Sequence, residues 1–286
     1  MLDISGAFNY EKSRFYAEKL DSGYPFLNCS VIGRTYSGKA IFSFSLGNGG
    51  NSVVIAGGTG GKSAQTSLIL YKFTENICES ILLGKEISGV DFSVLIKKFG
   101  ITVVPCLNPD SAEIAFSGYR ALKNECIPEK YFDREIWNAN SAGVDIDLNF
   151  DSDWRKEKML SLEKDILFAC GEGYPGNARE SEPETRAFVS LCRRHNFRSC
   201  LTLRTGKNRI FYRRRDRSPV SSAMMAKILA SPGFFHVSED EMPPCPSRWF
   251  ADEFSKPAFL TQAEKTTDTP SLYGKLEETL VLMSVM

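Results

Sequence analysis

The stretch at residues 52–70, SVVIAGGTGGKSAQTSLIL, constrains the fold of this 286-residue chain more than any other segment. Its β-branched run at 53–55 predicts a buried strand, and the glycines that follow predict a tight turn. Residues 64–70 then have the apolar spacing of a packed helix. A strand, a glycine-rich turn and a helix in this order are typical of α/β folds, in which ligands gather where strand ends meet helix N-termini.

The same stretch contains AGGTGGKS at residues 56–63, which satisfies a permissive Walker A pattern ending in Lys62 and Ser63. A P-loop nucleotide-binding protein is therefore one hypothesis. Two features weaken it: Ala56 replaces the usual first glycine, and the segment before Asp145 is too short and poorly placed to supply the aspartate that holds Mg²⁺. The competing interpretation is that the glycines only shape a turn.

Composition narrows the classes of protein and partner. Apolar residues make up 42% of the chain and charged residues 24%, as in ordinary soluble globular proteins. The 35 Lys and Arg balance the 35 Asp and Glu, so no overall field favours nucleic acid or a membrane as a partner. The eight cysteines include no CxxC pair, which indicates reduced thiols rather than a disulfide framework. Without an apolar signal region or a membrane-spanning run, the sequence predicts a cytoplasmic protein.

Strand-like and helix-like patterns alternate along the rest of the chain, which predicts one α/β domain over residues 1–286. Residues 111–142 are polar, which predicts mostly loop, and residues 143–150 are expected to form a short strand or turn. Residues 181–184 have the form of a capping box that begins a helix. Helices are expected at 10–20, 64–84, 90–98, 184–195, 219–231 and 271–286, and strands at 28–33, 40–46, 53–55, 101–107, 197–203 and 257–261.

Several short segments occur in a specific order over nearly the whole chain. They are IGR at 32–34, SGK at 37–39, the strand and Gly-Gly turn at 53–58, VP at 104–105, NPD at 108–110, Trp137, GVD at 143–145, NF at 149–150, YPG at 174–176, SEPET at 181–185 and PAF at 257–259. In this arrangement the chain resembles the zinc carboxypeptidase family, nearest to bacterial members that trim peptidoglycan peptides. The resemblance implies a three-layer α/β/α domain with a central mixed, mostly parallel sheet of about eight strands.

Active members of that family hold Zn²⁺ through a His-x-x-Glu pair after the glycine turn and through a later histidine, and a glutamate on a further strand is the general base. In this chain the resemblance places Gly60 and Ser63 at the His-x-x-Glu pair and Arg204 at the third ligand. The general-base position holds Gln262. Because none of these residues can do the family's chemistry, we expect neither zinc nor another cofactor.

The positions that face the substrate also differ from the family's pattern. The Asn-Arg pair that grips the substrate carboxylate is replaced by Asp147 and Leu148, and the basic residue after the family's tryptophan is Asn138. The chain has two histidines, which the sequence predicts to be structural: His195 at the end of a helix and His236 in a strand.

Two interpretations of the basic residues stay open. In the first, Arg204 and Lys62 keep the pocket floor cationic, the arginines between 209 and 217 lie on the next loop near the rim, and the pocket binds an anionic small molecule or peptide without turnover. In the second, Arg204 pairs with an acid such as Asp147, and the arginine run is a solvated face. The candidate ligand-binding residues are Lys62, Ser63, Arg204, Asn138, Asp147, Asn149 and Tyr212.

The leading hypothesis is therefore a catalytically inactive carboxypeptidase-like protein whose vacated pocket binds an anionic or peptide ligand. The alternative is an active zinc metallocarboxypeptidase that cleaves C-terminal or peptidoglycan-type peptide bonds. The second alternative is nucleotide binding through AGGTGGKS.

Overall fold

A computed structural model describes residues 1–47, 51–121, 127, 132–133, 135–213, 219–238 and 240–286. The strands are β1 (Asn28–Arg34), β2 (Ala40–Leu46), β3 (Ser52–Ala56), β4 (Gly100–Val104), β5 (Ser199–Thr205), β6 (Arg209–Tyr212), β7 (His236–Val237) and β8 (Ala258–Ala263). The α-helices are α1 (Tyr10–Gly23), α2 (Ala64–Leu83), α3 (Phe92–Leu95), α4 (Pro109–Ser117), α5 (Trp154–Glu163), α6 (Pro183–Arg194), α7 (Pro219–Leu229), α8 (Pro246–Phe254) and α9 (Thr269–Val285). Short 3₁₀ turns include η2 (Gly61–Ser63), η3 (Tyr119–Ala121) and η5 (Ile146–Leu148).

All eight strands belong to one mixed sheet in the order β1-β2-β4-β3-β5-β8-β6-β7. The four central strands, β4, β3, β5 and β8, are mutually parallel, and antiparallel pairs join them to β2 and to β6. The expected mixed, mostly parallel sheet of about eight strands is therefore confirmed. Because parallel strands all end at the same edge, the turns after β3, β5 and β8 meet there.

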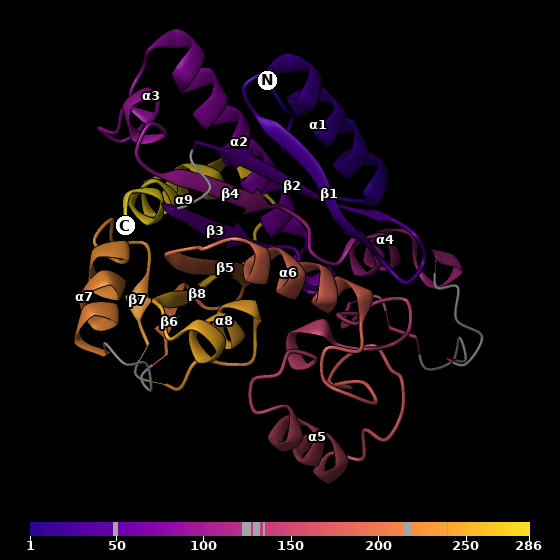
Figure 1. Ribbon diagram of the computed structural model, residues 1–286. Helices are drawn as coiled ribbons and strands as arrows, with labels where there is room; N and C mark the ends of the chain where they lie inside the picture. Colours follow the sequence, from indigo (N-terminus) through magenta and orange to yellow (C-terminus); the bar gives the residue numbers. More distant parts are fainter. Residues whose placement is uncertain (48–50, 122–126, 128–131, 134, 214–218, 239) are drawn as a thin grey trace.

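Helices cover both faces of the sheet, which gives the expected three layers (Figure 1). Alternate residues of the fully buried strand β3 enter opposite cores: Val53 and Ile55 pack with α2 and α9, whereas Val54 and Ala56 pack with α6 and α8. A strand buried on both faces reads as an uninterrupted apolar run, which is the pattern that singled out residues 53–55.

The structure corrects the expectation of mostly loop at residues 111–142. Helix α4 begins at Pro109, and the side chain of Asn108 caps it by accepting a hydrogen bond from the Ser111 amide. Asparagine at the N-cap followed by proline at the first helical position is a common start signal, so Asn108 and Pro109 begin a helix after the strand has ended. Residues 143–150 contain the turn η5 and no strand.

The capping box expected at residues 181–184 does not form. Helix α6 begins at Pro183 with Glu182 at its N-cap, and no side chain caps it. The Glu184 carboxylate instead accepts hydrogen bonds from the Tyr36 amide and from Asn140. A long-range polar contact has therefore replaced the local one that the sequence pattern favours.

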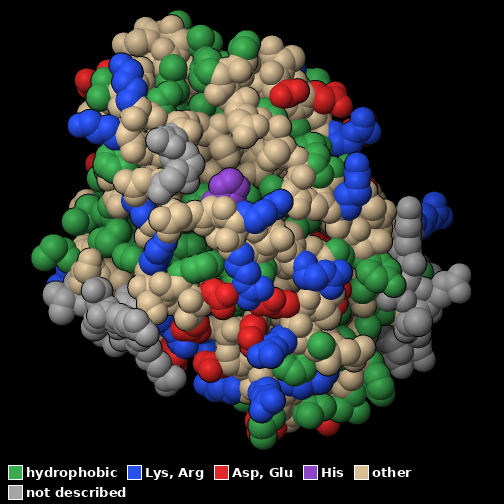
Figure 2. Space-filling model, viewed as in Figure 1, with side chains coloured by type: hydrophobic (Ala, Val, Ile, Leu, Met, Phe, Trp, Pro, Cys, Tyr) green, Lys and Arg blue, Asp and Glu red, His purple; other side chains and the backbone are tan. Residues whose placement is uncertain are grey.

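Charges of both signs share the surface. Figure 2 shows Lys and Arg side chains interspersed with Asp and Glu over one face, in line with the balanced composition. In the part of the chain that the structure describes, the cysteines at 29, 78, 106, 170, 192, 200 and 245 are free thiols. None of the helices within those residues has the length and apolar character that crossing a membrane requires.

Candidate functional site

Three of the residues expected at the site meet at the edge where the parallel strands end. Arg204 near the end of β5 is the register partner of Gln262 on β8. The Ser63 hydroxyl, which closes the turn after β3, accepts a hydrogen bond from the backbone N–H of Thr205 at 3.2 Å. The strand order therefore brings Ser63, Arg204 and Gln262 together from segments up to 199 residues apart.

The Arg204 guanidinium is bound to a carboxylate. Its Nη1 lies 3.0 Å from Oδ2 of Asp147, whose side chain is only 4% exposed, and 3.3 Å from the Pro244 carbonyl oxygen. The Thr59 hydroxyl donates a second hydrogen bond to the same oxygen of Asp147. This is the ion pair expected if Arg204 neutralises an acid such as Asp147 rather than binding a ligand. Although burial disfavours the guanidinium charge, Asp147 raises the pKa of Arg204 above its ordinary value.

A second buried acid lies next to this pair. Asp145 accepts hydrogen bonds from Asn138 Nδ2 and from the Gly173 amide. Burial, followed by the charge of Asp147, raises the pKa of Asp145 to about 7. The other oxygen of Asp147, Oδ1, is buried and has no hydrogen-bond partner among the described residues. The site thus contains two adjacent carboxyl groups and one guanidinium, so its charges largely cancel.

Asn138 fills the space into which a side chain at position 60 would project. A Cβ atom built on Gly60 overlaps the Oδ1 and Cγ atoms of Asn138 and lies 2.8 Å from its carbonyl oxygen. The Gly60 backbone is extended, with φ of −154°, so only packing restricts this position. Asn138 is itself held by backbone hydrogen bonding to Gly171 and by its side chain on Asp145.

Four backbone N–H groups of the glycine turn already have partners inside the protein. The N–H groups of Gly57 and Ser63 donate to the carbonyl oxygens of Val104 and Gly60. Those of Gly58 and Gly61 donate to the hydroxyl groups of Thr66 and Ser111. All four distances are 2.7–3.0 Å. A P-loop needs such groups to point at the phosphates. These four donors are therefore not available to a phosphate, which weakens the nucleotide hypothesis further.

Lys62 is also bound to a carboxylate. Its ammonium lies 2.6 Å from the Glu172 carboxylate, and both side chains are partly exposed, at 37% and 45%. Both cations of the expected pocket floor are therefore already paired with carboxylates, Lys62 with Glu172 and Arg204 with Asp147.

Asn149 and Tyr212 are also not brought to the strand edge. The Asn149 amide is buried and fully used: Nδ2 donates to the Pro175 and Ala178 carbonyls and to Ser181, and Oδ1 accepts from the Glu182 amide. Tyr212 pairs with Phe259 near the start of β8, whereas Gln262 lies near its end. Asn149 fixes the 175–182 loop, and Tyr212 packs on the core.

The described arginines between 209 and 217 are engaged in ion pairs. Arg209 belongs to β6, not to a loop, and is bound to Asp240 at 2.7 Å. Arg213 is 5% exposed and binds Asp252, Glu241 and Asp153. The arginines at 214, 215 and 217 lie outside the described residues.

The two histidines lie away from the Arg204–Asp147 ion pair. His195 caps the C-terminal end of α6, and its ring contacts Phe197, before β5 begins. His236 is exposed on β7, two strands from β8. Within the described ranges, no group of three or more His, Cys, Asp or Glu side chains is placed to hold a metal ion.

Sequence reasoning missed three partners that define the site. Thr59 donates a hydrogen bond to Asp147, Asp145 accepts one from Asn138, and Glu172 pairs with Lys62. Asp145 stood within the GVD segment, so its motif was visible, but its partners were not. Nothing in the local sequence of Glu172 links it to Lys62, 110 residues earlier.

Comparisons with known proteins match this geometry to one fold. The family model described as zinc carboxypeptidase matches residues 14–233. "Gamma-D-glutamyl-L-diamino acid endopeptidase 1" of Lysinibacillus sphaericus is 23% identical over 273 residues, covering 93% of this chain and 68% of that protein. Bovine thrombin-activatable fibrinolysis inhibitor, solved with a tick carboxypeptidase inhibitor, superposes with a TM-score of 0.76 at 16% identity over 98% of this chain and 97% of that one. Murein-tripeptide amidase MpaA of Escherichia coli O157 superposes with a TM-score of 0.59 at 18% identity, covering 90% of this chain and 92% of that one.

Proposed function

The chain belongs to the zinc carboxypeptidase family, and we propose that it is a member that binds peptides without hydrolysing them. The observation that carries this proposal is the packing of Asn138 against Gly60. A residue at position 60 large enough to ligate a metal has no room unless Asn138 moves. The difference from the family's zinc-binding pattern therefore extends from the ligand positions to the side chain of Asn138, which packs beside them.

The residues at the zinc positions do not fit the ion. Zinc sites use thiolate, imidazole or carboxylate ligands. Gly60 has no side chain, the Ser63 hydroxyl already accepts a backbone hydrogen bond, and Arg204 carries a permanent positive charge and no acceptor. A guanidinium bound to Asp147 would repel a dication at the same place. We therefore derive no catalytic step through zinc.

The position of the general base supports the same proposal. Gln262 carries a neutral amide, which does not take up a proton near neutral pH, so it cannot activate a water molecule as a glutamate would. The adjacent acids Asp145 and Asp147 are buried and bonded to Asn138, Thr59 and Arg204.

The ligand that we propose is a short peptide with free carboxylates. One relative is named as an endopeptidase for gamma-D-glutamyl-L-diamino acid bonds and one structural neighbour as a murein-tripeptide amidase, so this chemistry recurs among similar proteins. In this chain a ligand carboxylate would reach Arg204 only in competition with Asp147. We therefore expect weak binding at the strand edge that strengthens when Asp147 is replaced by asparagine.

Two assays of the full chain test the proposal. Metal analysis after incubation with Zn²⁺ should give far less than one ion per chain, and peptidase assays with C-terminal and peptidoglycan-type peptides should give no turnover. Stoichiometric zinc together with hydrolysis would establish the alternative, an active metallocarboxypeptidase. Titration with a muramyl peptide, followed by thermal unfolding, should show a larger shift for Asp147→Asn than for the unaltered protein; the exposed variant Asp151→Asn is the control.

A further inference from the structure

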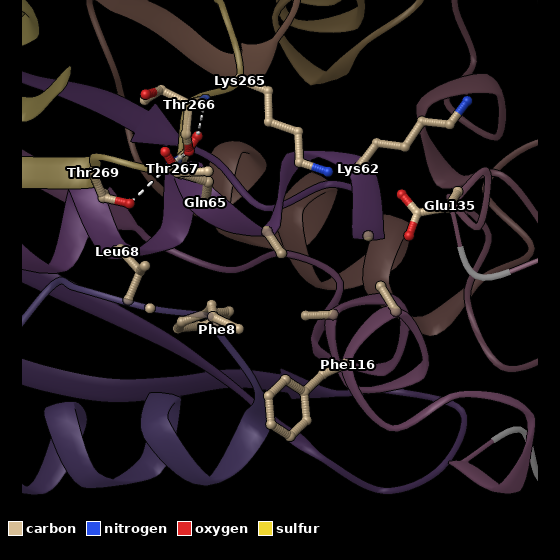
Figure 3. Close-up of a pocket in the computed structure, with 16 residues that line it drawn as sticks. Phe8, Lys62, Gln65, Leu68, Phe116, Glu135, Lys265, Thr266, Thr267 and Thr269 are labelled. Atoms are coloured by element: carbon tan, nitrogen blue, oxygen red, sulfur yellow. Dashed lines mark hydrogen bonds between the residues drawn. The ribbon is translucent and has the colours of Figure 1, made fainter.

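We propose that a cavity beside the strand edge binds an amphiphilic anion, a small molecule with an apolar body and one anionic head group. The cavity lies between the N-terminal segment, the start of α2, α4 and the 265–269 segment, and its volume is about 600 Å³ (Figure 3). Small-molecule sites commonly measure roughly 300–1,000 Å³. Neither Arg204 nor any of the family's zinc positions lines it, so this inference goes beyond the proposed function and does not depend on it.

One side of the cavity is apolar. Phe8 and Leu68 are almost fully buried beneath it, and Phe116 of α4 is 45% exposed at its edge. Figure 3 shows these three side chains on the side of the cavity opposite Lys265. An apolar group that covers Phe116 would remove a large exposed aromatic surface from water, which favours binding by roughly 25 cal/mol per Å² of apolar surface buried.

The opposite side of the cavity is cationic. In Figure 3 the Lys265 side chain reaches over the cavity toward the turn that carries Lys62, while Lys62 extends away from it. Lys62 is bound to Glu172, whereas no ion pair of Lys265 is recorded within the residues that the structure describes. Lys265 is therefore the cation available to a ligand. Glu135 stands on the far rim and would repel an anion placed near it.

Hydrogen bonds fix the segment that carries Lys265. The Gln65 side chain donates from Nε2 to the Thr266 carbonyl at 2.6 Å and to the Thr269 hydroxyl at 2.8 Å, and its Oε1 accepts from the Thr266 amide. These three bonds tie the residues after β8 to the first turn of α2. The ammonium is thus presented from an anchored backbone next to a preformed apolar wall, which lowers the entropic cost of binding.

A series of four ligands with the same tail tests head-group recognition. Octanoate, octyl phosphate, octanol and octylamine are titrated into the full chain by calorimetry and thermal unfolding. We expect both anions to bind and to raise the unfolding temperature, octanol to bind at least tenfold more weakly, and octylamine more weakly still. The ratio of the two anion affinities distinguishes a carboxylate from a phosphate ligand.

Four variants locate the site. Lys265→Gln should weaken both anions about tenfold and leave octanol unchanged, and Phe116→Ser should weaken octanol and the anions alike. Glu135→Gln should strengthen the anions about two- to threefold. Lys85→Gln is the matched control, because its exposed lysine lies at the opposite end of α2, about 30 Å away.

Equal binding of octylamine and octanoate, or anion binding that Lys265→Gln does not weaken, would overturn the proposal, as would the absence of any binding. The substituted side chains at 265 and 135 are exposed, so circular dichroism should show unchanged folding. The proposed function is tested by zinc content and peptidase activity, which are separate measurements. A negative result in the ligand titrations would therefore not contradict the proposed function, and zinc binding or hydrolysis would not contradict the cavity proposal.

Discussion

Arg204 of β5 and Asp147 of η5 are joined by a 3.0 Å ion pair across 57 residues of sequence. The pair links the edge of the sheet to the segment between α4 and α5, and Thr59 adds a hydrogen bond from the glycine turn. One buried interaction therefore holds three parts of the chain together at the position where the sequence resemblance predicts the family's third zinc ligand.

Breaking this pair from either side should be costly. Removal of one partner from a buried pair leaves an uncompensated charge, which typically costs about 3–5 kcal/mol in the free energy of unfolding. We expect Asp147→Asn and Arg204→Met each to destabilise the protein by about 3 kcal/mol, and the double variant to lose at least 1 kcal/mol less than the sum. Denaturant unfolding measures all three.

The control for this cycle is an exposed pair. Arg179 and Asp151 lie 2.7 Å apart with 67% and 40% of their side chains exposed, so Arg179→Met should cost less than about 1 kcal/mol. Strict additivity of the two buried substitutions would show that Arg204 and Asp147 do not stabilise each other.

Packing at Gly60 gives a second prediction. Gly60→Ala should destabilise the protein by about 2 kcal/mol, within the usual range for overpacking, because the new Cβ overlaps Asn138. In an Asn138→Ala background the same substitution should cost about 1 kcal/mol less, with the remainder due to the carbonyl oxygen at 2.8 Å. Gly274→Ala is the control: no atom lies within 4 Å of its Cβ in helix α9, so it should be neutral or slightly stabilising.

The sequence was sufficient for the framework of the fold. The run at 53–55 predicts a buried strand, and Asn9, whose side chain caps α1 by accepting a hydrogen bond from the Lys12 amide, is a typical helix start signal. These features depend on local periodicity and capping, which the chain displays directly. Helix α4 was missed because Pro109 was interpreted only as the end of a strand.

The site was less predictable because its contacts are long-range. The motif positions of Gly60, Ser63 and Arg204 were visible, but the space that Asn138 takes beside Gly60 depends on tertiary packing. Lys62 lies within the same eight-residue motif as Ser63, yet its side chain pairs with Glu172, 110 residues later in the sequence. Spacing in sequence therefore located the turn and left the direction of its side chains open.

Stability should depend on pH through Glu184. Burial raises the pKa of this carboxyl group to about 7, whereas its ordinary value is 4.5. As the pH rises from about 4.5 to 7, the unfolded chain ionises first, so the folded state loses stability over that window. The unfolding free energies of the unaltered protein and of Glu184→Gln are compared at each pH. The first minus the second should fall by about 3 kcal/mol between pH 4.5 and 7 and stay constant above pH 7.

This difference isolates Glu184 from Asp145, whose raised pKa acts in the same direction in both proteins. Denaturant unfolding at intervals between pH 4 and 8 provides the measurement. A difference that stays constant over this range would show that folding does not raise the pKa of Glu184.

Restoring the family's zinc ligands should fail unless the surrounding packing is restored with them. The triple variant Gly60→His, Ser63→Glu and Arg204→His has the right ligand types, but the imidazole at 60 collides with Asn138 and Asp147 is left without its cation. Adding Asn138→Gly removes the side-chain overlap, and Asp147→Asn removes the unpaired charge. We expect the fivefold variant to bind Zn²⁺ at least tenfold more tightly than the triple variant, as measured by competition with a chelator and by the visible spectrum of the Co²⁺ form.

The same pair of variants separates metal binding from hydrolysis. With Gln262 still in place the fivefold variant should hold zinc and remain inactive, because the neutral Gln262 amide cannot act as a general base. Gln262→Glu added to it should produce peptide hydrolysis. Equal zinc affinity of the triple and fivefold variants would show that Asn138 yields readily to a larger residue, and that the substituted ligands alone separate this protein from its active relatives.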